Sequence, residues 1–156
     1  MQTIQQLLLA LTPGIVIGFV LAILSYSLGL KRYHSEKWWE KKAEVYSKIM
    51  ESLYDMIIHT ERQMQDPSLK TNDSEKIEAE LTSRSKIASD QINRITVIGD
   101  FIISEVSANR LVELRKALAN AANYESWYEY LEAEYSALDK CIRDMRTFAK
   151  NDLGVK

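Results

Sequence analysis

The sequence predicts an all-α protein with one N-terminal transmembrane helix that continues into a cytoplasmic antiparallel bundle of about four helices. Only five glycines and two prolines occur in 156 residues, too few for a turn-rich β-protein. No charged side chain precedes Lys31, and beyond it apolar residues recur at the spacing of amphipathic helices. We therefore expect a tail and membrane helix in residues 1–30 and a bundle in residues 31–156, with helices at about 31–65, 74–98, 104–121 and 124–151.

The first predicted helix spans a membrane. Residues 7–30 read LLLALTPGIVIGFVLAILSYSLGL, and as a helix they extend about 36 Å, enough for a hydrocarbon core of about 30 Å. A cleaved signal peptide is the weaker alternative, because Met1 to Gln6 carry no basic residue and no small-residue cleavage site follows. Basic and aromatic residues follow the span, which places the C-terminal side in the cytoplasm. They are Lys31, Arg32, Lys37, Trp38, Trp39, Lys41 and Lys42.

Small residues recur every fourth position inside this segment, at Ala10, Gly14, Gly18 and Ala22. Such a stripe lets two helices approach closely and predicts a homo-oligomer, although a GxxxG pattern also arises from membrane composition alone. If several helices enclosed a lumen, the polar groups available to line it would include Gln5, Thr12 and Ser25.

Beyond the membrane, apolar positions alternate at spacings of four and three residues, as in a coiled-coil seam, and predict the helix at about 31–65. The stripe consists of Trp39, Ala43, Tyr46, Met50, Leu53, Ile57, Thr60 and Met64. No glycine or proline lies between Gly29 and Pro67. We therefore expect this helix to continue the membrane helix with little break.

Three further helices follow. Asn72 and Glu75 form a capping-box pattern before the second, Gly99 interrupts the apolar cluster ITVIGDFII after it, and Ser104 caps the third. The expected core positions are Ile77, Leu81, Ala88, Ile92, Ile95 and Ile98 or Phe101 in the second helix; Val106, Leu111, Leu114, Leu118 and Ala121 in the third; and Trp127, Leu131, Tyr135, Leu138, Ile142, Met145 and Ala149 in the fourth. Short loops between four helices favour an antiparallel bundle.

Composition and motifs argue against catalysis. Nucleotide-binding, esterase and metalloprotease motifs are missing from the sequence. Cys141 lies among core positions and is expected to be a buried small hydrophobe. Asp55 and His59 are spaced as a metal-ligand pair on a helix, but a plain rim histidine is the favoured interpretation. We expect no metal and no cofactor, and the net charge of −2 argues against binding duplex DNA.

On the fourth helix, Arg146 is followed five residues later by Asn151. This arrangement resembles that of RNases of the HEPN type, helical bundles that pair an arginine with a histidine four to six residues later, with Asn151 in the place of the histidine. Asparagine does not transfer protons near neutral pH, so the resemblance implies a degenerate bundle without nuclease activity. The alternative is that basic residues in the last turn complement the helix dipole.

The whole layout is similar to that of the single-pass membrane accessory proteins of RNA-targeting type VI-B CRISPR systems, which carry a divergent HEPN-like domain. The resemblance implies a protein of the bacterial inner membrane that acts in antiviral defence, with an RNA-guided nuclease or its RNA products as partner. We therefore expect a non-enzymatic, oligomeric effector or accessory that opens a pore when the nuclease is activated. The alternative is a membrane-tethered adaptor or scaffold that recruits a cytoplasmic partner, and the third is a membrane-tethered HEPN-like RNase.

Overall fold

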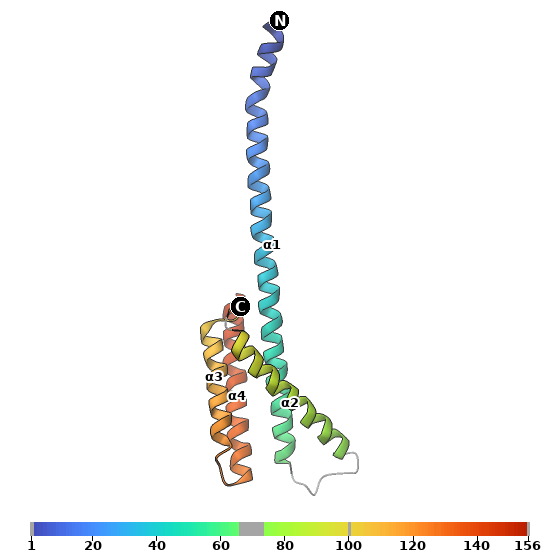
Figure 1. The fold of residues 1–156 in the computed structure, drawn as a ribbon, viewed down its shortest axis with the longest axis vertical. Coiled ribbons are helices and arrows are strands. Elements are labelled where there is room, and N and C mark those ends of the chain that lie inside the picture. The colour runs from blue at the N-terminus through green and yellow to red at the C-terminus, as the bar shows by residue number, and fades with distance from the viewer. Residues whose placement is uncertain (1, 66–73, 100, 156) are drawn as a thin grey trace. The chain divides into compact units, whose positions relative to one another are not determined.

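The computed structural model describes the backbone of residues 2–65, 74–99 and 101–155, and the side chains of these residues apart from 2–24, 27–32, 34 and 74. Throughout these ranges the regular structure is helical and contains no strand (Figure 1). The helices are α1 (Gln2–Met64), α2 (Ser74–Ile98), α3 (Glu105–Ala121) and α4 (Trp127–Leu153). The predicted all-α class is confirmed.

The chain divides into two compact units, Met1–Glu40 and Lys41–Lys156, and α1 contributes to both. Within the described residues the first unit holds no element other than α1. The boundary between these units follows Glu40, and the predicted boundary after residue 30 stays a prediction. Trp38 and Trp39, which precede Glu40, are 47% and 48% exposed and take no part in the buried core.

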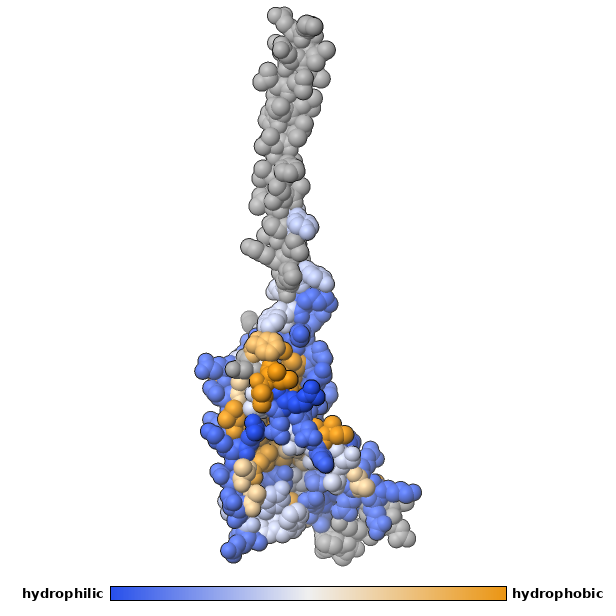
Figure 2. Space-filling view, viewed as in Figure 1, coloured by the Kyte–Doolittle hydropathy of each residue, from blue (hydrophilic) through white to orange (hydrophobic). Residues whose placement is uncertain are grey.

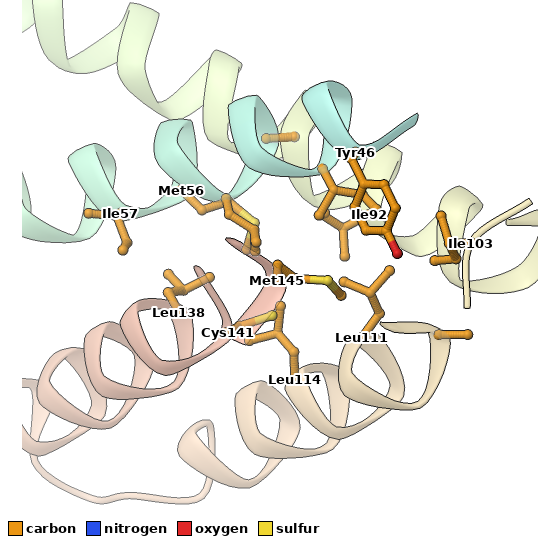
Figure 3. Packing of buried hydrophobic residues seen from close by; sticks show 14 residues of the cluster. Tyr46, Met56, Ile57, Ile92, Ile103, Leu111, Leu114, Leu138, Cys141 and Met145 are labelled. Carbon is orange, nitrogen blue, oxygen red and sulfur yellow. The ribbon is translucent and has the colours of Figure 1, made fainter. Parts of the chain in front are cut away.

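The second unit is a bundle around one hydrophobic core to which all four helices contribute (Figure 3). Its fully buried side chains include Ile49, Leu53, Leu111, Leu138 and Met145. Cys141 lies among them with 0% exposure, which confirms its predicted burial.

The buried face of α1 is wider than the predicted seam. Tyr46, Leu53 and Ile57 are buried as expected, but Ile49 and Met56 are buried too, and Trp39 at the start of the stripe is exposed. A straight helix with 3.6 residues per turn presents a broad apolar face to several neighbours, whereas a 3.5-residue seam serves a single supercoiled partner. The segment therefore packs as a bundle helix.

Helix α2 joins the core through its C-terminal half. Ala88 and Ile92 are buried, whereas the predicted core residues Ile77, Ile98 and the following Phe101 are 48%, 55% and 67% exposed. Figure 1 shows the first turns of α2 extending away from α3 and α4. The apolar spacing of α2 thus predicted the helix correctly but not which of its side chains are covered.

Gly99 ends α2 and turns the chain toward α3. Its amide donates to the Ile95 carbonyl oxygen at 2.7 Å, and its own carbonyl accepts from the amides of Ile102 and Ile103. This tight turn places Ile103 in the core at 5% exposure. The interruption predicted at Gly99 is present, and Ser104 caps α3 by accepting a hydrogen bond from the Ser107 amide.

A polar cluster ties α1, α3 and α4 together. The Tyr46 hydroxyl contacts Ser107 Oγ at 2.7 Å and donates a short hydrogen bond to the carboxylate of Asp152. The same carboxylate accepts from the Ser104 amide at 3.0 Å. Two side chains and one helix N-terminus are thereby satisfied together, as buried polar groups require.

Helix α4 starts and ends at recognisable caps. Ser126 precedes Trp127 and accepts from the Glu129 amide, and Gly154 adopts φ 66° after Leu153. The sequence placed the start at residue 124. Trp127, predicted as a core residue, is 62% exposed and stacks on Tyr130 with ring centroids 5.2 Å apart.

Among the residues that the structure describes, no helix has a stretch long and apolar enough to cross a membrane. The predicted span at residues 7–30 falls on side chains that, Ser25 and Tyr26 apart, lie outside the described residues. The transmembrane helix therefore stays a prediction.

Candidate functional site

The residues assigned to the membrane segment are described only in part. The small-residue stripe of Ala10, Gly14, Gly18 and Ala22, the pore-lining candidates Gln5 and Thr12, and the flank residues Lys31 and Arg32 lie outside the described side chains. Ser25, Trp38, Trp39 and Lys41 are exposed, and Lys42 is half-buried. Lys37 pairs with Glu40 at 2.7 Å, and this hydrogen bond raises the pKa of the lysine.

Arg146 and Asn151, which carry the HEPN resemblance, are both exposed on α4. The buried arginine of the bundle is instead Arg110 on α3, which the sequence analysis did not single out. Its Nε lies 2.7 Å from an Asp144 carboxylate oxygen, and its Nη1 lies 3.2 Å from Glu113. These carboxylates neutralise the guanidinium, so Arg110 links α3 to α4 as a structural ion pair.

Asp55 and His59, which are spaced as a metal-ligand pair, each contact other side chains. Asp55 forms an ion pair with Arg84, and His59 Nε2 contacts Gln63 at 2.9 Å and Thr82 at 3.3 Å. Within the described part of the chain, no group of three or more histidine, cysteine or acidic side chains is arranged to hold a metal ion.

A hollow of the bundle lies between α1 and the C-terminal half of α2. It has a volume of about 530 Å³ and is lined mainly by aliphatic and aromatic side chains. Val45 comes from α1, Ile87, Ile95 and Ile98 come from α2, and Phe101 comes from the segment after α2. We call this surface the apolar groove, and Figure 2 shows that hydrophobic residues on the bundle surface are surrounded by hydrophilic ones.

The groove exists because the C-terminal end of α2 has more apolar positions than one buried face can use. Ile92 faces the core, whereas Ile87, Ile98 and Phe101 of the groove are 63%, 55% and 67% exposed. Clustered exposed apolar side chains on a folded protein mark an interaction surface. The dense cluster ITVIGDFII was the sequence signal for it, but Ile95 and Ile98 or Phe101 of this cluster were expected in the core.

Charged side chains at the rim of the groove have both signs. Lys48 pairs with Glu44 at 2.5 Å, and Arg94 lies one helical turn from Asp90 on α2. This surface therefore binds mainly through apolar contacts, and the rim supplies both positively and negatively charged side chains.

No protein-family model, curated protein or solved structure matches this chain. The similarity to HEPN-type RNases and to type VI-B accessory proteins stays a prediction. Function is therefore inferred from the arrangement of the side chains.

Proposed function

We propose that this chain is a membrane-anchored helical adaptor, with residues 7–30 spanning a bacterial inner membrane and the bundle of residues 41–156 in the cytoplasm. One observation carries the proposal. Residues 7–30 form a stretch of 24 residues without a charged side chain, and this stretch lies within α1. A helix that is apolar over this length is stable in a bilayer, where its backbone groups are satisfied internally.

A pair of charged substitutions tests the anchor. Ile17→Lys with Leu21→Lys places two ammonium groups near the middle of the span, each costing about 2.5–3.5 kcal/mol on insertion. We expect the wild-type chain to stay in the membrane pellet after alkaline extraction and the double variant to leave it. Ile17→Leu with Leu21→Ile is the matched control. A wild-type chain that is released by alkaline extraction would overturn the anchor.

A reporter fused after Lys156 tests the orientation. The basic flank predicts a reporter that is active only in the cytoplasm. Activity of this fusion in the periplasm would reverse the orientation and with it the assignment of a cytoplasmic partner.

The apolar groove supports the adaptor function, with a partner helix that presents a row of apolar side chains as its occupant. Phe101→Glu places a carboxylate in the groove and should abolish that contact, whereas Val106→Glu, at a residue 57% exposed outside the groove, should not. A photo-crosslinking residue at Ile98 in intact cells measures the contact. We expect one discrete adduct that Phe101→Glu removes and Val106→Glu retains, and an adduct of two copies of this chain would contradict the adaptor.

The small-residue stripe favours a second function, an oligomeric effector in antiviral defence that opens a pore when an RNA-guided nuclease is activated. Gly14→Leu with Gly18→Leu should reduce the size of the assembly, because the added side chains block close helix approach. A voltage-sensitive dye in cells with the activated system separates the two functions. Depolarisation supports the effector, and protection with normal polarisation supports the adaptor. RNA cleavage is not proposed, because Asn151 occupies the place of the proton-transferring histidine.

A further inference from the structure

A second hollow of the bundle is polar. It has a volume of about 380 Å³, within the range of about 300–1,000 Å³ of small-molecule sites, and side chains of all four helices line it. Glu134 and Tyr130 come from α4 and His59 from α1. Thr82, Ser85 and Ser89 of α2 are spaced three and four residues apart, so their hydroxyls follow one side of that helix. We call this hollow the polar pocket.

Glu134 is the central group of the polar pocket because its half-buried carboxylate has hydrogen-bond donors and His59 beside it but no lysine or arginine among the described residues. Among the described residues, no lysine or arginine lies within ion-pair distance of it. Burial raises the pKa of Glu134, and hydrogen bonds from Tyr130 and Thr60 together with the nearby His59 offset only part of this effect. Burial also raises the pKa of Tyr130 to about 12, so its hydroxyl remains a neutral donor.

Two other charged residues line the polar pocket, and their charges have opposite signs. Lys86 and Asp90 both lie on α2 and are exposed. The pocket has two carboxylates, those of Glu134 and Asp90, against the one ammonium group of Lys86, and His59 is its remaining titratable side chain besides Tyr130. An anionic ligand is disfavoured for this reason, and a metal ion is disfavoured because the described side chains offer no set of three ligands.

We propose that the polar pocket binds a small organic cation with a primary amine. Its ammonium group pairs with the Glu134 carboxylate. This pairing compensates for the hydration that the carboxylate loses through burial. An ammonium group has three N–H donors. The hydroxyl oxygens of Ser85 and Ser89 accept those of its hydrogen bonds that Glu134 does not accept. This site shares Asp90 with the rim of the apolar groove, and it does not depend on the adaptor function.

Matched probes test the charge requirement. Butylamine, 1,4-diaminobutane and 1-butanol are titrated into the full-length chain in detergent, and the His59 imidazole resonances are followed by NMR. We expect saturable shifts with both amines and none with the neutral alcohol. Equal responses to butylamine and butanol would mean that the pocket takes up apolar chains, and no response to either amine would exclude an amine site.

Three substitutions test the residues. Glu134→Gln should weaken amine binding at least tenfold, whereas Glu132→Gln, an exposed neighbour on the same helix, should leave it unchanged. Lys86→Met should strengthen binding because it removes the competing ammonium group. This variant also tests the site if Glu134→Gln does not fold. Binding that survives Glu134→Gln in a folded chain, or that Lys86→Met weakens, would overturn the proposal.

Discussion

Gly99→Ala should destabilise the bundle because this glycine has no room for a β-carbon. A Cβ at residue 99 would lie 3.0 Å from Ile95 Cγ2 and 3.3 Å from the Ile95 carbonyl carbon, and closer still to the carbonyl oxygen. Carbon atoms pack best at about 3.5–4.0 Å. The Ile95 carbonyl cannot withdraw freely, because it accepts the Gly99 amide at 2.7 Å. The turn must open, and Ile103, 5% exposed in the core, must move with it.

Over-packing of this kind costs about 1–3 kcal/mol. For a bundle of this size a loss of about 2 kcal/mol corresponds to a fall in Tm of roughly 8 °C. The assay is thermal and urea unfolding of the full chain in detergent, followed by near-ultraviolet circular dichroism, which reports side-chain packing.

Gly154→Ala is the matched control. Gly154 also ends a helix, but it has φ 66° and open space around its Cβ position, so its substitution adds strain without a clash. We expect it to cost about 1 kcal/mol. A Gly99→Ala variant that loses less than Gly154→Ala would refute the steric argument and show that the turn relaxes easily.

Three further predictions concern the core and its polar cluster. Burial opposes ionisation of Asp152, but hydrogen bonds from Tyr46 and Ser104 hold its pKa below the ordinary value. Asp152→Asn should therefore cost about 1–2 kcal/mol at pH 7, and the difference should vanish as the pH falls below about 4 through the lowered pKa; a difference that persists at pH 2 would contradict this. Cys141 is 0% exposed, and this burial raises the pKa of its thiol to about 11. Its alkylation by iodoacetamide should thus follow the unfolded fraction in urea, and rapid labelling of the folded chain would argue against the packing. Leu111→Ala removes a side chain that is 0% exposed and should cost about 2–5 kcal/mol in the same unfolding assay, whereas Val112→Ala, 37% exposed, should cost much less.

The sequence alone determined the helical class and the local signals that divide the chain. Apolar periodicity, the scarcity of glycine and proline, and caps such as Ser104 act within a few residues, so they can be read without a partner. The break at Gly99 is of the same kind. The uncharged segment 7–30 is also a local property, and from it the membrane prediction follows directly.

Only the tertiary structure decided which apolar faces are covered. Ile92 and Phe101 belong to the same cluster in the sequence, yet one is 2% and the other 67% exposed. Periodicity shows that a face is apolar but does not say which helix, if any, lies against it. For this reason Ile95 and Ile98 or Phe101, which line the apolar groove, were expected in the core.

The polar contacts of the bundle were equally hidden. Tyr46 and Asp152 are separated by 106 residues, Arg110 and Asp144 by 34, and Glu134 meets His59 from another helix. Such contacts depend on how the helices rotate and cross, which no short pattern encodes. Their energies also depend on burial, because loss of water is what shifts the pKa of Glu134 and makes the pairing of Arg110 necessary. The sequence thus determined the elements, and the packing of those elements determined the candidate sites.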